Sequence, residues 1–211
     1  WKTDRILHVA VEQKLPVIWY AEGGGGRPGD DRSGPGHRTF GAIGEVSGVV
    51  PFISVVSGYC FAGNASVAGM SDIIIACKGS NLGMAGPAMI EGGGMGIVNA
   101  KDIGPLHEQI ANGVVDLAAE DEADATRLAK RALSYFQGRT ANWECADQRL
   151  LRRSIPENRL RAYDVRALIH TLADKDSVLE LRPHFGQTVI TAFIRIEGRP
   201  VGLIANDNHH L

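Results

Sequence analysis

The chain has 211 residues, 44% of them hydrophobic, and its 22 Lys and Arg against 24 Asp and Glu leave a formal net charge of −2 at pH 7. This balance is typical of a soluble globular protein and gives no reason to expect nucleic acid as a partner. No apolar run approaches the roughly 20 residues that a helix needs to span a membrane, so we expect no membrane partner either.

The first half of the chain alternates helix-like and strand-like segments. Apolar runs at 16–21, 51–56 and 72–77 predict buried strands, and a shorter strand is expected at 81–84. Helical patterns lie between them, at 6–15, which ends before Pro16, at 39–49 and at the small residues 64–70. Glycine turns follow the strands. This alternation predicts α/β layering.

The second half changes character. A glycine-poor helix is predicted over 120–136, followed by an irregular polar arm and a second helix over 163–173. Three strands follow, and the Glu197-Gly198 pair predicts a tight hairpin between the last two. The strands lie at 178–181, 189–196 and 200–205. We therefore divide the chain into a first domain at 1–136, a connecting arm and helix at 137–174, and the beginning of a new sheet at 175–211.

Both ends of the chain look cut. The sequence opens at Trp1 directly into a helical pattern, without an initiator Met, and stops just after a strand-like run. Targeting signals are therefore expected to lie outside it. The three cysteines, Cys60, Cys77 and Cys145, have no CxxC or metal-ligand spacing. Reduced thiols in a cytoplasm or an organelle matrix are the simplest interpretation.

The first of three glycine clusters, Glu22 to Asp30, has two possible interpretations. It lacks the Lys-Ser/Thr ending of a phosphate loop and the GxGxxG order of a dinucleotide site. It is either a flexible surface loop or a backbone cradle for a ligand, with Arg27 available for a phosphate.

The second and third clusters are also ambiguous. Gly58 to Gly63 follows an apolar strand and precedes a helix. Its amides would then bind a ligand at the helix N-terminus, or the segment is simply a tight turn without a ligand. In the third cluster, Gly86-Pro87 can start a helix, and Gly92 to Gly94 permits close approach of a backbone or ligand.

Taken together, these stretches carry a family resemblance. Its core is Gly58 to Asp72, followed by Asn81-Leu-Gly-Met-Ala-Gly-Pro-Ala-Met-Ile90. Glu22-Gly-Gly-Gly-Gly-Arg27 lies where the pattern has an acid or Ser before Gly-Gly-Ala-Arg, and Ile196 to Asn206 matches the start of a second domain. In this order, over nearly the whole chain, the stretches resemble the carboxyltransferase family of the crotonase superfamily, a component of biotin-dependent acyl-CoA carboxylases.

The resemblance implies an α/β crotonase-like ββα superhelix, with this chain a fragment of a two-domain carboxyltransferase. Residues 1–136 would be the acyl-CoA-binding domain, lacking its N-terminal part, and 175–211 the first strands of the truncated second domain. The implied reaction moves a carboxyl group from carboxybiotin to the α-carbon of an acyl-CoA, with the freed biotin nitrogen as base.

The implied site consists mainly of backbone. By resemblance, the amides of Ala62 and Gly63 hold the enolate, so no reactive side chain and no metal in this domain are required. The residues expected to line the CoA or biotin path are Gly24, Gly25, Gly26, Arg27, Gly86, Pro87, Gly93 and Gly94. Tyr59-Cys60-Phe61 is bulkier than is usual in the family, which leaves the acyl-chain size open.

The resemblance also implies partners. A biotin carboxyl carrier and a biotin carboxylase would act with the protein. The family forms homo-oligomers whose active site lies between the first domain of one subunit and the second domain of another. The chain by itself is therefore expected to be inactive.

Two rival hypotheses use the same residues. Gly58-Tyr-Cys60-Phe-Ala after a strand resembles the nucleophile elbow of a cysteine-dependent α/β hydrolase, with His170 or His184 as the base. Alternatively, the chain is a noncatalytic scaffold in which the glycine turns serve packing alone. Replacing Cys60 with Ala distinguishes a hydrolase from a carboxyltransferase, and titration with CoA or a short acyl-CoA distinguishes an enzyme from a scaffold.

Overall fold

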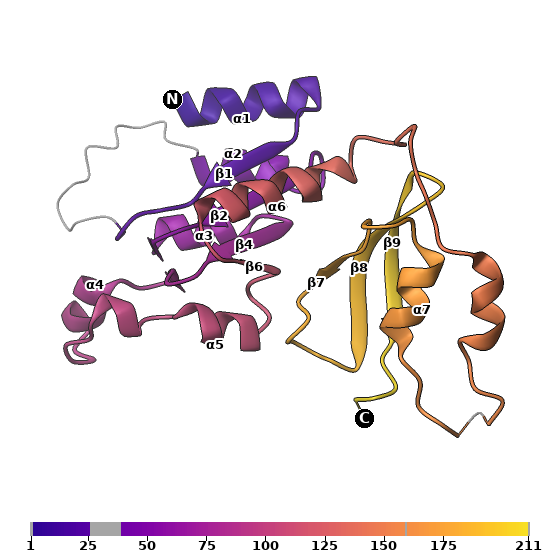
Figure 1. Cartoon of the computed structure of the whole chain (residues 1–211). Helices are drawn as coiled ribbons and strands as arrows, with labels where there is room; N and C mark the ends of the chain where they lie inside the picture. Colours follow the sequence, from indigo (N-terminus) through magenta and orange to yellow (C-terminus); the bar gives the residue numbers. More distant parts are fainter. Residues whose placement is uncertain (1, 26–38, 159, 211) are drawn as a thin grey trace. The chain divides into compact units, whose positions relative to one another are not determined.

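The computed structural model describes residues 2–25, 39–158 and 160–210 (Figure 1). The chain divides into two compact units, Trp1–Ala129 and Lys130–Leu211. The boundaries that the sequence suggested, at 136 and 174, both fall inside the second unit. The expected arm and the expected new sheet thus belong to one compact unit.

A parallel sheet forms the centre of the first unit. Its order within the described residues is β1 (Val17–Tyr20), β2 (Phe52–Val56), β4 (Ile73–Cys77) and β6 (Leu117–Ala119). Every residue of β2 and β4 is buried, as expected of central strands in a parallel sheet covered on both faces. The predicted strands at 16–21, 51–56 and 72–77 are confirmed; β6 was not foreseen.

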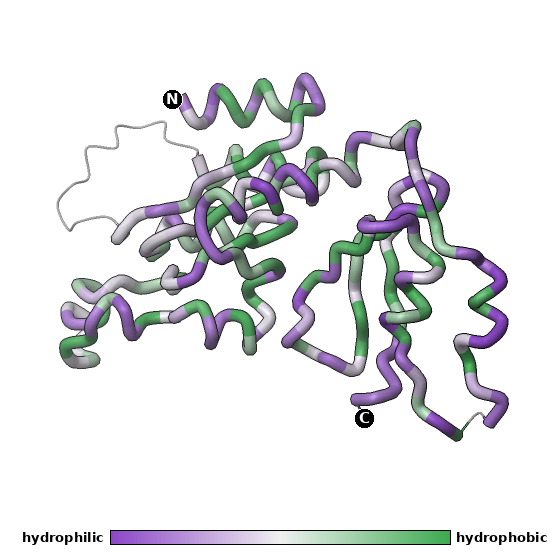
Figure 2. Tube along the Cα trace, in the orientation of Figure 1, coloured by the Kyte–Doolittle hydropathy of each residue, from purple (hydrophilic) through white to green (hydrophobic). Residues whose placement is uncertain are grey.

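Helices cover this sheet. The helices α1 (Lys2–Gln13) and α2 (Thr39–Val46) bury Leu7, Ile43 and Val46 in one cluster with Phe52 of β2. A second cluster joins β2 and β4 to α3 (Gly63–Gly69), where Ala65 and Ala68 allow the short helix to lie close to the strands. Figure 2 shows apolar residues along these strands.

The segment after β2 adds a small parallel pair, β3 (Tyr59–Phe61) and β5 (Asn81–Gly83), to this unit. Beyond β5 come α4 (Pro87–Gly92), the 3₁₀ helix η1 (Ala100–Asp102), α5 (Leu106–Ala111) and α6 (Glu122–Ser134). Gly104 must be glycine: its φ is +51°, and an added Cβ would lie 1.9 Å from the Leu82 carbonyl oxygen.

The second unit is an antiparallel sheet, β7 (Leu179–Leu181), β8 (Val189–Ile196) and β9 (Arg199–Asn206). The helices η2 (Gln148–Arg153) and α7 (Val165–Leu172) precede it, and α7 contributes Val165 and Ile169 to its core. The predicted hairpin is confirmed: Glu197 and Gly198 have φ of 52° and 76°, and the buried Asp174 carboxylate accepts hydrogen bonds from both amides, at 3.0 and 2.7 Å.

None of the helices in the described ranges combines the length and the apolar character of a membrane span.

Candidate functional site

The glycine loop after β1 extends the small parallel pair. The Gly23 amide donates to the Tyr59 carbonyl at 2.7 Å, and the Phe61 amide donates back to the Gly23 carbonyl at 3.0 Å. Gly23 has a φ of +145°, and an added Cβ would lie 2.5 Å from Nδ2 of Asn64 in α3. The first and second glycine clusters, well separated in the sequence, are therefore hydrogen-bonded neighbours.

The turn between β3 and α3 is centred on Ala62. Its φ of 53° and ψ of −121° form a conformation that residues other than glycine rarely adopt. Its amide donates to the Gly83 carbonyl at 3.2 Å and so continues the pairing of β3 with β5. The Ala62 amide, which the resemblance makes an oxyanion donor, therefore has its hydrogen engaged inside the fold.

The Gly63 amide is different. Gly63 is the first residue of α3, no side chain caps this helix, and the first internal bond at this end runs from the Ser66 amide to the Ala62 carbonyl at 2.9 Å. Within the described part of the chain the Gly63 amide has no hydrogen-bond partner. Such amides are normally satisfied by a side chain, by water or by a ligand.

Residues from the first and third clusters lie against this turn. A Cβ added to Gly25, whose φ is +89°, would lie 3.2 Å from the Ala62 Cβ, and one added to Gly86 would lie 2.9 Å from the Gly24 carbonyl oxygen. One added to Gly24 meets none of the described residues within 4 Å. The structure therefore brings Gly24, Gly25 and Gly86 together at one turn, with space beside Gly24 that no described residue fills.

The remaining predicted residues are not part of this convergence. Gly26 and Arg27 lie outside the described residues. Pro87 is at the start of α4, as predicted, with Gly86 as its N-cap. Gly93 and Gly94 follow the other end of that helix, where their amides bond locally to the Met89 and Glu91 carbonyls.

Sequence reasoning missed a polar pair beside the turn. The Ser57 hydroxyl donates to the Glu22 carboxylate through a short hydrogen bond, and an added Cβ at Gly58 would lie 3.8 Å from Glu22 Oε2. Glu22 immediately precedes the glycine run and Ser57 immediately follows β2. The hydrogen bond therefore ties the ends of two parallel strands together next to the site.

Cys60 is poorly suited to nucleophilic chemistry. It lies inside β3 rather than at the turn, and its side chain is fully buried. Burial, with a further contribution from the Glu22 carboxylate, raises the pKa of the thiol to about 12. The reactive thiolate is therefore almost unpopulated near neutral pH.

We expect Cys60→Ala to retain carboxyl transfer within about threefold, because the thiol contacts no reacting atom and only a small buried volume is lost. A steady-state assay of the whole enzyme, alongside thermal unfolding of both proteins, measures this. Complete loss of activity in a variant that unfolds normally would restore the cysteine-nucleophile hypothesis.

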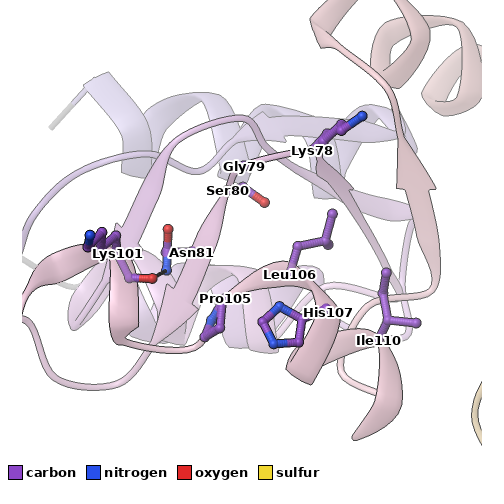
Figure 3. A pocket seen from close by; sticks show the side chains of 9 residues that line it. All are labelled: Lys78, Gly79, Ser80, Asn81, Lys101, Pro105, Leu106, His107 and Ile110. Atoms are coloured by element: carbon purple, nitrogen blue, oxygen red, sulfur yellow. Dashed lines mark hydrogen bonds between the residues drawn. The ribbon is translucent and has the colours of Figure 1, made fainter.

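A cavity of about 410 Å³ lies beside Asn81 of β5 (Figure 3). Ser80, Asn81, Leu106 and His107 line it, and Lys78 and Lys101 stand at its edges. The Asn81 amide group donates to the Lys101 and Ile103 carbonyls, both at 2.9 Å, which fixes this wall. Two lysines and a histidine without a lining carboxylate suit an anionic group.

The cavity escaped the sequence analysis because its walls come from three separate segments. In the described ranges, no three His, Cys, Asp or Glu side chains gather as metal ligands would.

In the parallel sheet, β2 is followed by the short strand β3, then by the glycine turn at Ala62, and then by the small-residue helix α3. This arrangement defines a crotonase-like α/β domain. The family model described as "Carboxyl transferase domain" matches residues 2–211. The chain belongs to the carboxyl transferase domain family.

Curated relatives agree with this assignment. The chain is 31% identical to the propionyl-CoA carboxylase beta chain of Rhodococcus erythropolis, over 96% of this chain and 45% of the relative. It is 30% identical to the methylmalonyl-CoA carboxyltransferase 12S subunit of Propionibacterium freudenreichii subsp. shermanii, over 97% of this chain and 41% of the relative. The chain thus spans less than half the length of these two proteins.

Solved structures share the fold. A single-chain, multi-domain long-chain acyl-CoA carboxylase superposes with a TM-score of 0.93 at 54% identity, over 100% of this chain and 21% of that one. The transcarboxylase 12S hexamer with methylmalonyl-CoA bound gives a TM-score of 0.81 at 26% identity, over 99% and 42% of the two chains. The expected crotonase-like α/β fold is therefore confirmed.

Proposed function

We propose that this chain supplies the acyl-CoA side of a biotin-dependent carboxyl transfer to the α-carbon of an acyl-CoA. Membership of the carboxyl transferase domain family supports the reaction class, and relatives named for propionyl-CoA, methylmalonyl-CoA and long-chain acyl-CoA support a thioester substrate. The cysteine-hydrolase alternative is not favoured, because its nucleophile is a buried thiol of raised pKa.

The observation that carries the proposal is the Gly63 amide, which has no partner in the described residues and lies at the turn against which the glycine loop packs. Removing a proton from the α-carbon places negative charge on the thioester oxygen. A fixed peptide N–H that meets this charge stabilises the transition state without reorganising, typically by roughly 3–4 kcal/mol per donor.

We assign the second donor to the glycine loop, because the Ala62 amide is occupied. Gly25 lies against Ala62, and its amide has no hydrogen-bond partner in the described part of the chain. An oxygen held between the Gly63 and Gly25 amides would receive hydrogen bonds from two chain segments. Glycine is suited to this loop, since its φ of +89° at Gly25 would strain any other residue.

The cofactor would fit this arrangement beside Gly24, where an added Cβ meets no described residue within 4 Å. Carboxybiotin supplies the carboxyl group and, once that group has left, a nitrogen that takes up the α-proton. The chain's own contribution is to hold the thioester oxygen, to position the α-carbon beside the open loop, and to keep side chains out of the path.

The same proposal covers the partners. A biotin carboxyl carrier and a biotin carboxylase would provide carboxybiotin, in the cytoplasm or an organelle matrix. The related transcarboxylase 12S protein assembles as a hexamer, which supports a homo-oligomer here.

CoA has three phosphate groups, and the cavity beside β5, with Lys78 and Lys101 at its edges, is suited to an anion.

The test is direct transfer from a carrier that has been charged beforehand with labelled carboxybiotin. The full-length protein is mixed with this carrier and with acyl-CoAs ranging from acetyl- to palmitoyl-CoA, and acid-stable label in the CoA product is measured. We expect label in at least one thioester. Loss of label from the carrier as bicarbonate, with none in any thioester, would contradict the proposal.

A further inference from the structure

An apolar surface follows directly after β5. Large apolar side chains are exposed here to an unusual degree: Met84 by 65%, Met89 by 56%, Met95 by 70% and Ile97 by 87%. We refer to these four residues as the methionine surface. They include three of the four methionines in the whole chain. All four lie within the 14 residues from 84 to 97, and exposed apolar side chains that gather on a surface generally mark a binding site.

The local fold ties Met89 and Met95 to one helix, α4. Met84 leaves the end of β5, and Met89 lies in the first turn of α4, where its amide donates to the Gly86 carbonyl at 3.0 Å. The glycines after α4 let the chain turn back, and the Met95 amide donates to the Ile90 carbonyl at 3.1 Å. Met95 therefore returns to the helix that carries Met89.

The methionine surface begins at the candidate oxyanion turn. The Gly83 carbonyl, one residue before Met84, accepts the Ala62 amide at 3.2 Å. An added Cβ on Gly86, two residues after Met84, would lie 2.9 Å from the Gly24 carbonyl oxygen. A group attached to a thioester carbonyl at this turn thus starts next to the surface.

The chemistry of the segment selects hydrocarbon over the polar parts of a CoA thioester. The segment 84–97 has one charged residue, Glu91, and it contains no Lys or Arg that would bind phosphate. The amides of Met89, Ile90, Gly93, Gly94 and Met95 all bond to carbonyls within the segment, which leaves little to pair with the amides of a pantetheine arm. Methionine side chains are flexible and apolar, and so adapt to a hydrocarbon chain.

We propose that the methionine surface binds the acyl chain of the substrate, and that it selects long acyl chains over acetyl and propionyl groups. The inference rests on the proposed carboxyl transfer and deepens it by naming the substrate class. A short acyl group ends at the turn and does not reach Met89 or Met95. A long one lies across both.

Chain-length selectivity of the whole enzyme tests this. Met89→Gln and Met95→Gln keep side-chain length and add polarity. Each methylene that loses apolar contact costs roughly fourfold in affinity. We expect the ratio of kcat/KM for palmitoyl-CoA to kcat/KM for acetyl-CoA to fall about tenfold in each variant and about 100-fold in the double variant. Leu160→Gln changes a side chain that is 95% exposed elsewhere and should leave the ratio unaltered.

The possible results separate the two proposals. If the unmodified enzyme carboxylates no acyl-CoA, the proposed function fails, and this inference with it. If it is active but both variants lower palmitoyl- and acetyl-CoA turnover equally, only the acyl-chain assignment is overturned. Sedimentation velocity identifies the alternative occupant: if the variants dissociate the oligomer and the ratio is unchanged, the surface is an interface between copies.

Discussion

Gly63→Pro is expected to lower kcat for carboxyl transfer by about 100- to 1,000-fold. Proline has no amide hydrogen, so the variant removes the donor that we assign to the developing negative charge. Gly63 is the first residue of α3, a helix position that accepts proline well because the amide there makes no bond within the helix. Steady-state kinetics of the full-length enzyme at saturating acyl-CoA measures the effect.

Gly63→Ala is the matched control. It keeps the amide, and its Cβ would lie 3.3 Å from Cζ of Phe40, a side-chain atom that can move by a few tenths of an ångström. We expect less than a tenfold loss. Equal losses in the proline and alanine variants, with similar thermal unfolding, would show that the side-chain volume at this turn matters and the amide does not.

The second large effect is expected at the contact between the first and third glycine clusters. Gly86→Ala places a Cβ 2.9 Å from the Gly24 carbonyl oxygen, which is backbone and can move only together with the glycine loop. Displacing that loop also displaces the Gly25 amide. Because misplacement by about 1 Å can cost about 100-fold in rate, we expect kcat/KM to fall roughly 10- to 100-fold.

Gly92→Ala serves as its control. The substitution is the same, at the last residue of the helix that Gly86 caps, but among the described residues an added Cβ at Gly92 meets nothing within 4 Å. We expect wild-type kinetics. A Gly86→Ala enzyme as active as the Gly92→Ala enzyme would mean that the loop is not held by this contact, and would remove the reason for assigning Gly25 as a donor.

The central fold could be predicted well from the sequence, for a physical reason. Buried parallel strands such as β2 and β4 need apolar residues at every position, and that signal is strong even in five residues. Short strands give a weaker sequence signal. β3 lies within a glycine cluster whose composition predicts a turn, and the sequence of β6, Leu-Ala-Ala, is equally compatible with a helix. Their pairing partners stabilise them, and pairing is not visible locally.

The glycine clusters of the candidate site could be predicted from the sequence, but the hydrogen bonding of its amides could not. The glycines indicated where the chain bends close to a ligand, and Gly24, Gly25 and Gly86 do converge. Which amide stays unpaired depends on a strand about 20 residues further along, since Gly83 takes the hydrogen of Ala62. The cavity of Lys78 and Lys101 and the methionine surface depend on burial, which the sequence pattern did not reveal.

The carbonyl stretch of bound substrate measures the hydrogen bonds to the thioester oxygen directly. An acyl-CoA labelled with ¹³C at its carbonyl carbon is bound to the full-length enzyme, and the isotope-edited infrared band is compared with that of the free thioester. We expect a lower frequency in the wild-type and Gly63→Ala enzymes, and a band returned toward the free value in Gly63→Pro. A bound carbonyl at the free frequency in the wild-type enzyme would contradict stabilisation by backbone amides at this turn.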